Sequence, residues 1–179
     1  MSSIPAGRAR RAVGAIRGRI RLMDDAELLQ HMTDLGHELP PPPGPVASYV
    51  PVRIAGGTAY VAGQVPIVNG VVTTPGLLGR EVTVAEGQAA ARQAALQSLS
   101  ALRDALGSFD RLLGILQVTV YIASATEFDE HAVVANGASD LLVEILGDAG
   151  KHARAAIGMA SLPLGGCVEV AMIAEVIPA

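Results

Sequence analysis

The stretch TVAEGQAAARQAALQSLSALRDALG, residues 83–107, decides the fold, because it carries the strongest helix signal of the chain. Thr83 and Glu86 are spaced as a capping box, in which each residue satisfies a free backbone N–H of the other at the helix start. Gly107 supplies the stop. One apolar stripe runs along the helix, formed by Leu96, Leu99, Leu102 and Leu106. Such a stripe needs an apolar surface to cover, and the flanking sequence predicts a β-sheet.

Strand patterns lie on both sides of this helix. Residues 52–66 read as a hairpin, with Gly56 and Gly57 supplying the backbone angles of a tight turn. Residues 67–79 are rich in turn residues and leave room for one short strand. After the helix, LLGILQVTVYIAS at 112–124 alternates, which is typical of a half-buried strand. One face of it holds Leu116, Val118, Val120 and Ile122, and the other holds Gln117, Thr119 and Tyr121.

A second helix is predicted from about residue 130 to 146, with Gly147 as its end. Two further strands, 154–160 and 167–176, are joined by SLPLGG, and we expect them to form a hairpin that turns near Leu164. The order β-β-(β)-α-β-α-β-β predicts an α+β fold. We expect a single mixed sheet with both helices packed on one face.

The last strand separates two kinds of side chain. Facing the helices we expect Val168, Val170, Met172, Ala174 and Val176. The other face receives Cys167, Glu169, Ala171, Ile173 and Glu175, beside Gln117, Thr119 and Tyr121. This second face is too apolar for open water and too polar for a dry core. We therefore predict that it lies at a subunit interface and that the protein is an oligomer.

Composition limits the possible classes of protein. A chain of 179 residues is long enough for one domain with a real core, and without tryptophan and with only two phenylalanines that core is aliphatic. Cys167 is the single cysteine, which excludes an internal disulfide and cysteine-rich zinc sites, so we expect a cytoplasmic protein. No apolar run is long enough for a membrane span. The histidines lack metal-binding spacing, and we expect neither metal nor cofactor.

The N-terminal residues 1–22 differ from the rest, because they hold six arginines and no acid. The remainder has seven basic residues and seventeen acids, so it repels nucleic acid, whereas the tail alone would attract it weakly. Three interpretations compete: a disordered basic arm, a transit peptide, or a start codon set too far upstream of Met23. We expect a dispensable tail, then a helix and proline-rich connector at 23–45, and the main domain at 46–179.

Two charges stand out in the final strands. Arg154, at a strand entrance, can bind a carboxylate through two parallel N–H bonds, and the alternative is a salt bridge to Asp148, Glu169 or a neighbouring subunit. Glu169 can orient a water as a base or serve as a structural partner. In the expected hairpin Glu169 pairs near Met159, on the order of 16 Å along the strand from Arg154. Either a bulge shortens this distance or the pocket crosses a subunit boundary, which we favour.

Several segments resemble the RidA/YjgF family of small trimeric proteins, whose best-known activity is the hydrolysis of reactive enamines and imines. They are YVPVRIAGGTAYVAGQVP at 49–66, EGQAAARQAALQSLSALRDALG at 86–107 and HARAAIGMASLPLGGCVEV at 152–170. Residues 133–158 are similar to a subgroup labelled chorismate-mutase-like, a label that describes a fold. Residues 23–45 are similar to the N-terminus of that subgroup, which favours Met23 as the natural start.

The resemblance implies roles for four residues. Arg154 matches the arginine that grips the substrate carboxylate, and Glu169 matches the acidic residue of the last strand. Tyr49 matches a tyrosine at the border of the pocket, and Asn136 an asparagine of the second helix. Two positions depart from the family: its Tyr-Ser pair is Tyr49-Val50 here, and a cysteine often found two residues after the arginine is Ala156.

Together these observations predict a cytoplasmic homotrimeric enzyme that converts 2-imino or 2-enamino acids into 2-oxo acids and ammonia. The expected catalytic residues are Arg154 and Glu169, and the expected substrate-binding residues are Arg154, Tyr49 and Asn136. The main alternative is a protein of the same fold that binds or senses a small carboxylate without catalysis. RNA cleavage and chorismate rearrangement are further alternatives that the resemblance brings in.

Overall fold

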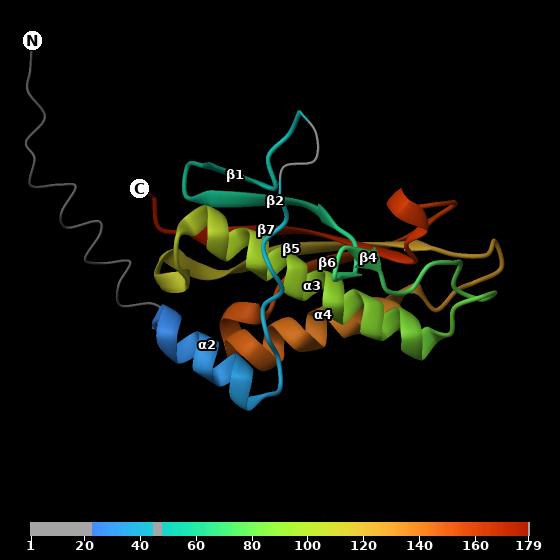
Figure 1. The fold of residues 1–179 in the computed structure, drawn as a ribbon, viewed down its shortest axis with the longest axis horizontal. Helices are drawn as coiled ribbons and strands as arrows, with labels where there is room; N and C mark the ends of the chain where they lie inside the picture. The colour runs from blue at the N-terminus through green and yellow to red at the C-terminus, as the bar shows by residue number, and fades with distance from the viewer. Residues whose placement is uncertain (1–22, 45–47, 179) are drawn as a thin grey trace, which may run out of the picture.

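A computed structural model of the chain describes residues 23–44 and 48–178 (Figure 1). The basic tail predicted for residues 1–22 lies outside the described residues. The helices are α2 (Asp25–Asp34), α3 (Val84–Leu106) and α4 (His131–Leu146). The strands are β1 (Val52–Ala55), β2 (Thr58–Gln64), β3 (Ile67–Val68), β4 (Val71–Val72), β5 (Leu112–Ala123), β6 (Ala153–Met159) and β7 (Val168–Val176). Short 3-10 turns follow α3 (η1, Phe109–Arg111), follow α4 (η2, Gly147–Gly150) and precede β7 (η3, Pro163–Gly165).

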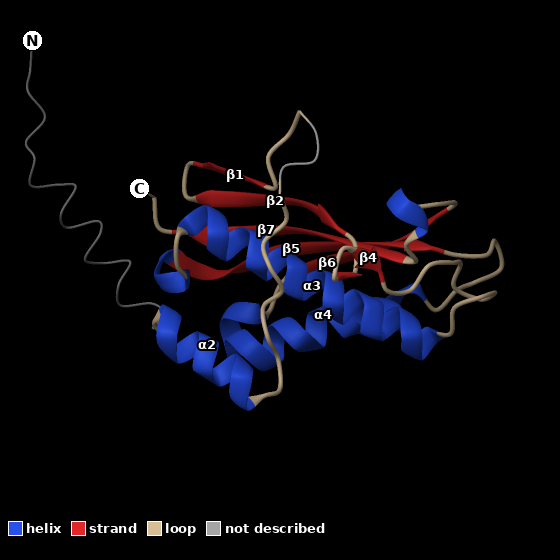
Figure 2. Ribbon diagram, in the orientation of Figure 1, coloured by secondary structure: helices blue, strands red, loops and turns tan. Residues whose placement is uncertain are grey.

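Five strands form one mixed sheet in the order β1-β2-β7-β5-β6 (Figure 2). All neighbours are antiparallel except β5 and β6, which run parallel on either side of the crossover helix α4. The expected hairpin of the last two strands is therefore wrong, because β7 inserts between β2 and β5. The burial of the two strands agrees with this order. Every second residue of β7 is buried, as in a central strand, whereas the residues of the edge strand β6 are largely exposed.

The predicted turns and helix ends occur where the sequence places them. Gly56 and Gly57 have φ angles of 57° and 82°, as a two-residue turn between β1 and β2 requires. Thr83 and Glu86 form the capping box of α3, and Gly107 ends that helix with a φ of 81°. The expected single short strand in 67–79 is instead two, β3 and β4, which pair with each other.

Helices α3 and α4 form a second layer on one side of the sheet (Figure 1). α3 packs mainly on β2 and β7, and α4 on β5 and β6. The two helices cross very closely at Gly137, where a Cβ atom would overlap the backbone of Gln88. Gln88 also donates a hydrogen bond of 3.0 Å from its Nε2 to the carbonyl of Val133. α4 therefore has a fixed position over the edge of the sheet.

The N-terminal helix α2 is tied to this layer. Asp24 and Glu27 form its capping box, and Leu28 and Met32 are buried. Asp25 accepts hydrogen bonds from Arg103 at 2.9 and 2.7 Å, and this contact lowers the pKa of the Asp25 carboxyl. The proline connector then crosses α3, where the carbonyl of Pro40 accepts a 2.6 Å bond from Ser100 Oγ. The expected helix and extended connector thus belong to the packed structure.

The other face of the sheet carries no α-helix among the residues that the structure describes (Figure 2). It presents half-buried or exposed side chains, among them Tyr60, Thr119, Tyr121, Ile157, Glu169, Ala171 and Ile173. We call this surface the open face.

Two residues were placed wrongly by strict alternation. Leu116 was expected on the helix side but is 45% exposed, because the register of β5 and β7 shifts between Ile115 and Gln117 and Ile115 takes the core position. Cys167 was expected on the open face but is fully buried ahead of β7, where its backbone N–H bonds the carbonyl of Thr74. In the described part of the chain, no helix combines the length and apolarity that a membrane span needs.

Candidate functional site

Arg154 lies on the edge strand β6, on the side of the sheet that faces α4. It pairs with Val118, a buried residue of β5, so both side chains point toward the helix layer. Its Nη1 donates to Asn136 Oδ1 at 2.8 Å and to Ser139 Oγ at 3.1 Å, and its Nη2 donates to the carbonyl of Ala132 at 3.2 Å. These three acceptors occupy one face of α4, since they are spaced four and three residues apart. The structure thus brings the predicted residues Arg154 and Asn136 together.

The guanidinium of Arg154 has no carboxylate within 4.0 Å among residues 23–44 and 48–178. Asp148, one of the expected alternative partners, instead pairs with Lys151 at 2.8 Å. A guanidinium carries five N–H groups, and Nε is engaged by none of the described residues. Arg154 therefore keeps donors on neighbouring nitrogens, Nε and Nη2, that suit a planar anion.

Ser139 and His152 extend this contact, and the sequence analysis did not select them. Ser139 Oγ lies 3.0 Å from His152 Nε2, and His152 Nδ1 lies 2.6 Å from the carbonyl oxygen of Gly150. A signal for both was available. Ser139 follows Asn136 by three residues on one helix face, and His152 precedes Arg154 by two residues, the spacing that returns a strand to the same face.

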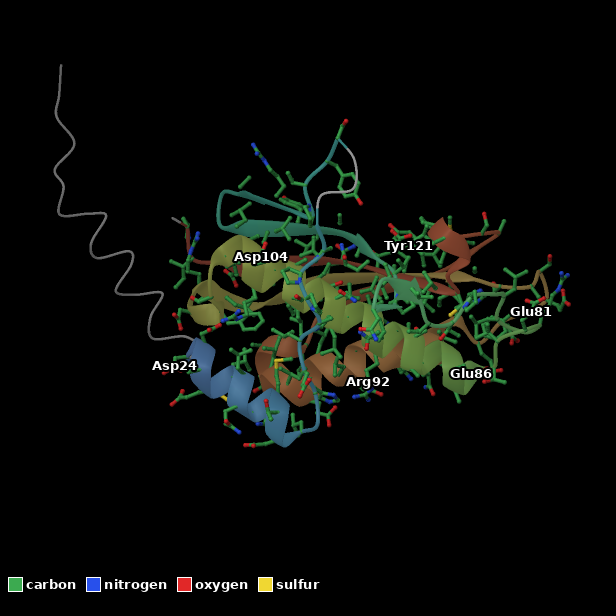
Figure 3. The ribbon with its side chains drawn as sticks, viewed as in Figure 1. Asp24, Glu81, Glu86, Arg92, Asp104 and Tyr121 are labelled. Carbon is green, nitrogen blue, oxygen red and sulfur yellow. The ribbon has the colours of Figure 1, made fainter. Side chains whose placement is uncertain are left out.

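Glu169 lies on the opposite side of the sheet, on the open face. It is paired with Tyr121 of β5, and its side chain lies directly over Gly63, where a Cβ atom would overlap its carboxyl group. Figure 3 labels Tyr121 on the sheet. Glu169 is half-buried, and this burial raises the pKa of its carboxyl group. Among the described residues none donates a hydrogen bond to this carboxyl group or forms an ion pair with it, so its burial sets the direction of the shift.

One chain does not bring Arg154 and Glu169 together. Arg154 pairs with Val118 and Glu169 pairs with Tyr121, so the two are separated by two strand spacings and three residues. With about 4.8 Å per strand and about 3.3 Å per residue, their backbones are about 14 Å apart. Their side chains also point to opposite faces. A small substrate cannot contact both in one subunit.

Tyr49 is also distant from Arg154. It lies three residues before β1, at the edge of the sheet opposite β6, and its side chain is 52% exposed. Its neighbour Val50, at the position of the family's serine, is 57% exposed. Tyr49 is therefore available to border a pocket on another subunit, but it does not border Arg154 in its own chain.

Other reactive side chains are placed elsewhere. Burial raises the pKa of the Cys167 thiol to about 11, which keeps it protonated and unreactive at neutral pH. His131 Nε2 lies 3.0 Å from Ser124 Oγ, and its ring makes an edge contact with Phe128. Within the described ranges, no three His, Cys, Asp or Glu residues are arranged to hold a metal ion.

Comparison with known proteins places this chain in a family. Residues 30–176 match the family model described as "YjgF/chorismate_mutase-like, putative endoribonuclease". Protein TCP17 from Trypanosoma cruzi is 44% identical over 144 residues, which cover 79% of this chain and 89% of TCP17.

Two solved structures are similar over most of the chain. The protein Atu1372 from Agrobacterium tumefaciens, whose function is unknown, has a TM-score of 0.78 and 39% identity over 84% of this chain and 94% of its own. A "putative endoribonuclease" from Shewanella oneidensis MR-1 has a TM-score of 0.80 and 33% identity over 83% of this chain and 98% of its own. The chain therefore belongs to the YjgF/chorismate mutase-like (RidA) family, and the expected α+β fold is confirmed.

Proposed function

We propose that the protein hydrolyses reactive 2-imino and 2-enamino acids to 2-oxo acids and ammonia, at sites on the subunit boundaries of a homotrimer. The observation that carries this proposal is the Arg154 guanidinium, which three hydrogen bonds to α4 hold in place without an acidic partner in the described chain. Membership of the RidA family supports the reaction class, because imine and enamine hydrolysis is the best-known activity of that family.

Arg154 would bind the carboxylate of the substrate. Its Nε–H, which none of the described residues engages, and the remaining N–H on Nη2 can form two parallel, charge-assisted hydrogen bonds with the two carboxylate oxygens. The contacts with Asn136, Ser139 and Ala132 fix the plane of the guanidinium before the substrate arrives. In this account Asn136 orients Arg154, and Tyr49, exposed at the far edge of the sheet, borders the pocket of a neighbouring subunit.

Glu169 would act as the base toward water. Its ionised carboxylate accepts a proton as the water oxygen bonds to the imine carbon, while the electron pair of the C=N bond moves to nitrogen. Glu169 then returns that proton to the nitrogen, which gives a carbinolamine. It next takes the hydroxyl proton and passes it to the amino nitrogen, so that the C–N bond breaks and ammonia leaves as the C=O bond of the 2-oxo acid forms. A 2-enamino acid enters this sequence after a proton moves to its carbon. The raised pKa of Glu169 suits a group that both accepts and returns a proton.

For Arg154 and Glu169 to act on one substrate, a second subunit would be needed. Arg154 and Glu169 of one chain lie on opposite faces of the sheet, so the Glu169 that serves a given Arg154 comes from a neighbour. The open face supports such an assembly, because Tyr60 and Ile157 are 50% and 41% exposed there. Large apolar side chains gathered on a sheet without a covering helix favour burial against another copy.

Release of ammonia from freshly generated 2-iminopropanoate tests the proposal. We expect wild type to accelerate it and Arg154→Ala to lose at least about 100-fold in kcat/KM, since a charged pair of hydrogen bonds is removed. Arg92→Ala is the matched control, because Arg92 pairs with Glu144 at 3.0 Å on the helix layer, where Figure 3 labels it. An Arg154→Ala protein as active as wild type contradicts the assigned role.

A non-catalytic carboxylate sensor is the second candidate. The observation that favours it is that one chain supplies a prepared anion site at Arg154 while the only base considered lies on the other face. Saturable binding of pyruvate without any acceleration of imine hydrolysis would select this function. RNA cleavage is not proposed, since the chain after residue 22 holds seventeen acids and seven basic residues and repels a polyanion.

A further inference from the structure

Behind the contact between Arg154 and α4 lies a second set of hydrogen bonds that the proposed reaction does not use. Ser139 Oγ accepts a bond from Arg154 Nη1 at 3.1 Å and lies 3.0 Å from His152 Nε2. The other ring nitrogen of His152, Nδ1, lies 2.6 Å from the carbonyl oxygen of Gly150. Arg154, Ser139, His152 and Gly150 thus form one continuous chain of contacts, which we call the Ser139–His152 relay.

The Gly150 carbonyl at the far end of the relay determines which atom donates in each hydrogen bond. The Gly150 carbonyl can only accept, so Nδ1 of His152 carries the proton. In a neutral imidazole Nε2 then accepts, and it accepts from the Ser139 hydroxyl. With its proton directed to His152, Ser139 presents lone pairs to Arg154 Nη1. Every donor in the relay therefore points away from Arg154, and no two donors face each other.

The far end of the relay is rigid. Gly150 is buried at the end of turn η2, and a Cβ atom there would overlap the backbone carbonyl of Leu142 in α4. The carbonyl that holds His152 therefore belongs to a segment packed directly on the helix. Because His152 and Ser139 are both partly buried, few waters can replace their mutual bond. The relay connects the Arg154 guanidinium to fixed backbone.

We propose that His152 is a positioning residue for carboxylate binding, acting through Ser139 to hold the Arg154 guanidinium in its receptive orientation. This inference rests on the proposed function, in which Arg154 binds the substrate carboxylate. His152 touches no substrate in this account. It limits the orientations of Ser139, and Ser139 limits those of the guanidinium, so that less ordering remains to be done when the anion binds.

The test uses four variants of the full chain and two readouts. Pyruvate is titrated by NMR, and KM and kcat are measured with 2-iminopropanoate. We expect His152→Phe, which removes both ring nitrogens, to raise the pyruvate Kd and the KM about 5- to 10-fold, with kcat within about twofold. His152→Gln keeps an acceptor for Ser139 and should recover most of this loss. Ser139→Ala should match His152→Phe, and the double variant should be no worse than either alone.

Lys151→Ala is the matched control, since Lys151 adjoins His152 but pairs with Asp148 on the exposed surface. Thermal unfolding of each variant shows whether it folds, and His152→Gln and Ser139→Ala carry the test if His152→Phe does not. A folded His152→Phe that binds pyruvate as wild type does, or single effects that multiply in the double variant, would overturn the positioning role. Pyruvate binding that is absent from wild type, or unchanged in Arg154→Ala, would instead refute the proposed function and the relay's role with it.

Discussion

The two faces of the sheet differ in how much of a site one chain can build. On the helix side of β6, Arg154 is held by three hydrogen bonds from α4, and the bonding continues through Ser139 to His152. On the open face, Glu169 is half-buried over Gly63 without a hydrogen-bonding side chain among the residues described. In the proposed function, one subunit would therefore orient the Arg154 guanidinium by itself. Glu169 would acquire its final surroundings only when another subunit covers it.

The largest effect is expected at the crossing of α3 and α4. This crossing lies on the helix side of the sheet, which is the side that Arg154 faces. In Gly137→Ala the new Cβ would overlap the Gln88 backbone, and backbone atoms cannot move aside cheaply. We expect the free energy of unfolding to fall by about 3 kcal/mol, beyond any gain in helix propensity. Urea denaturation measures this. An unchanged midpoint would show that α4 is not fixed by this contact.

Arg154→Lys separates charge from geometry on the same side. Lysine keeps the positive charge but lacks the planar fork and cannot reproduce the bonds to Asn136, Ser139 and Ala132. We expect the Kd for pyruvate to rise about 30-fold, which corresponds to about 2 kcal/mol. Calorimetric titration checks it. Equal affinity in the two proteins would mean that a point charge suffices and that the contacts with α4 are irrelevant to binding.

Gly63→Ala is the counterpart of Gly137→Ala on the open face. Here the three atoms nearest to the new Cβ all belong to the flexible Glu169 side chain (Oε1, Cδ and Cγ), which can swing away. We expect stability to change by less than about 1 kcal/mol, while kcat for 2-iminopropanoate falls about 10-fold and KM stays within about twofold. Steady-state kinetics and thermal unfolding together give the answer. A stability loss as large as that of Gly137→Ala would remove the contrast between the two faces.

The smallest effect is the pH dependence that Glu169 contributes. Burial raises the pKa of this carboxyl in the folded protein, so the folded state holds the proton more tightly than the unfolded state does. Its contribution to stability is therefore present below the unfolded pKa and is lost as pH rises through the folded pKa. As pH rises through the folded pKa of Glu169, wild type should lose stability relative to Glu169→Gln. Over the same pH range the kcat/KM of wild type should increase. Identical pH profiles of stability in the two proteins would contradict this.

Local signals predicted most of the elements. The capping box at Thr83 and Glu86 and the turn at Gly56-Gly57 each depend on neighbouring residues, and the structure has both. The alternation of residues 168–176 also placed the buried side chains of β7 correctly. The position of β7 between β2 and β5 depends on pairing between strands far apart in sequence, which alternation does not encode. The bulge at Leu116 was not predicted for the same reason, because it arises from the register of two strands.

The candidate site was predicted in part. Arg154 and Asn136 do meet, since a strand entrance and one face of the crossover helix are adjacent in a β-α-β unit. The linear estimate of the distance between Arg154 and Glu169 assumed a hairpin that does not form, and it could not show that they lie on opposite faces. Ser139 and His152 were not predicted, because the histidines were considered only as metal ligands. The useful signal is the spacing of Ser139 from Asn136 and of His152 from Arg154.

Subunit mixing tests most directly whether the two faces meet in the assembly. Arg154→Ala and Glu169→Gln are each purified, and their subunits are then dissociated and reassembled together, with each variant reassembled alone as a control. Because each mixed trimer contains one boundary where an intact Arg154 meets an intact Glu169 of its neighbour, the account predicts that ammonia release from 2-iminopropanoate reappears, at about a quarter of wild-type activity when the two variants are mixed equally. Mixed assemblies as inactive as the separate variants would contradict it.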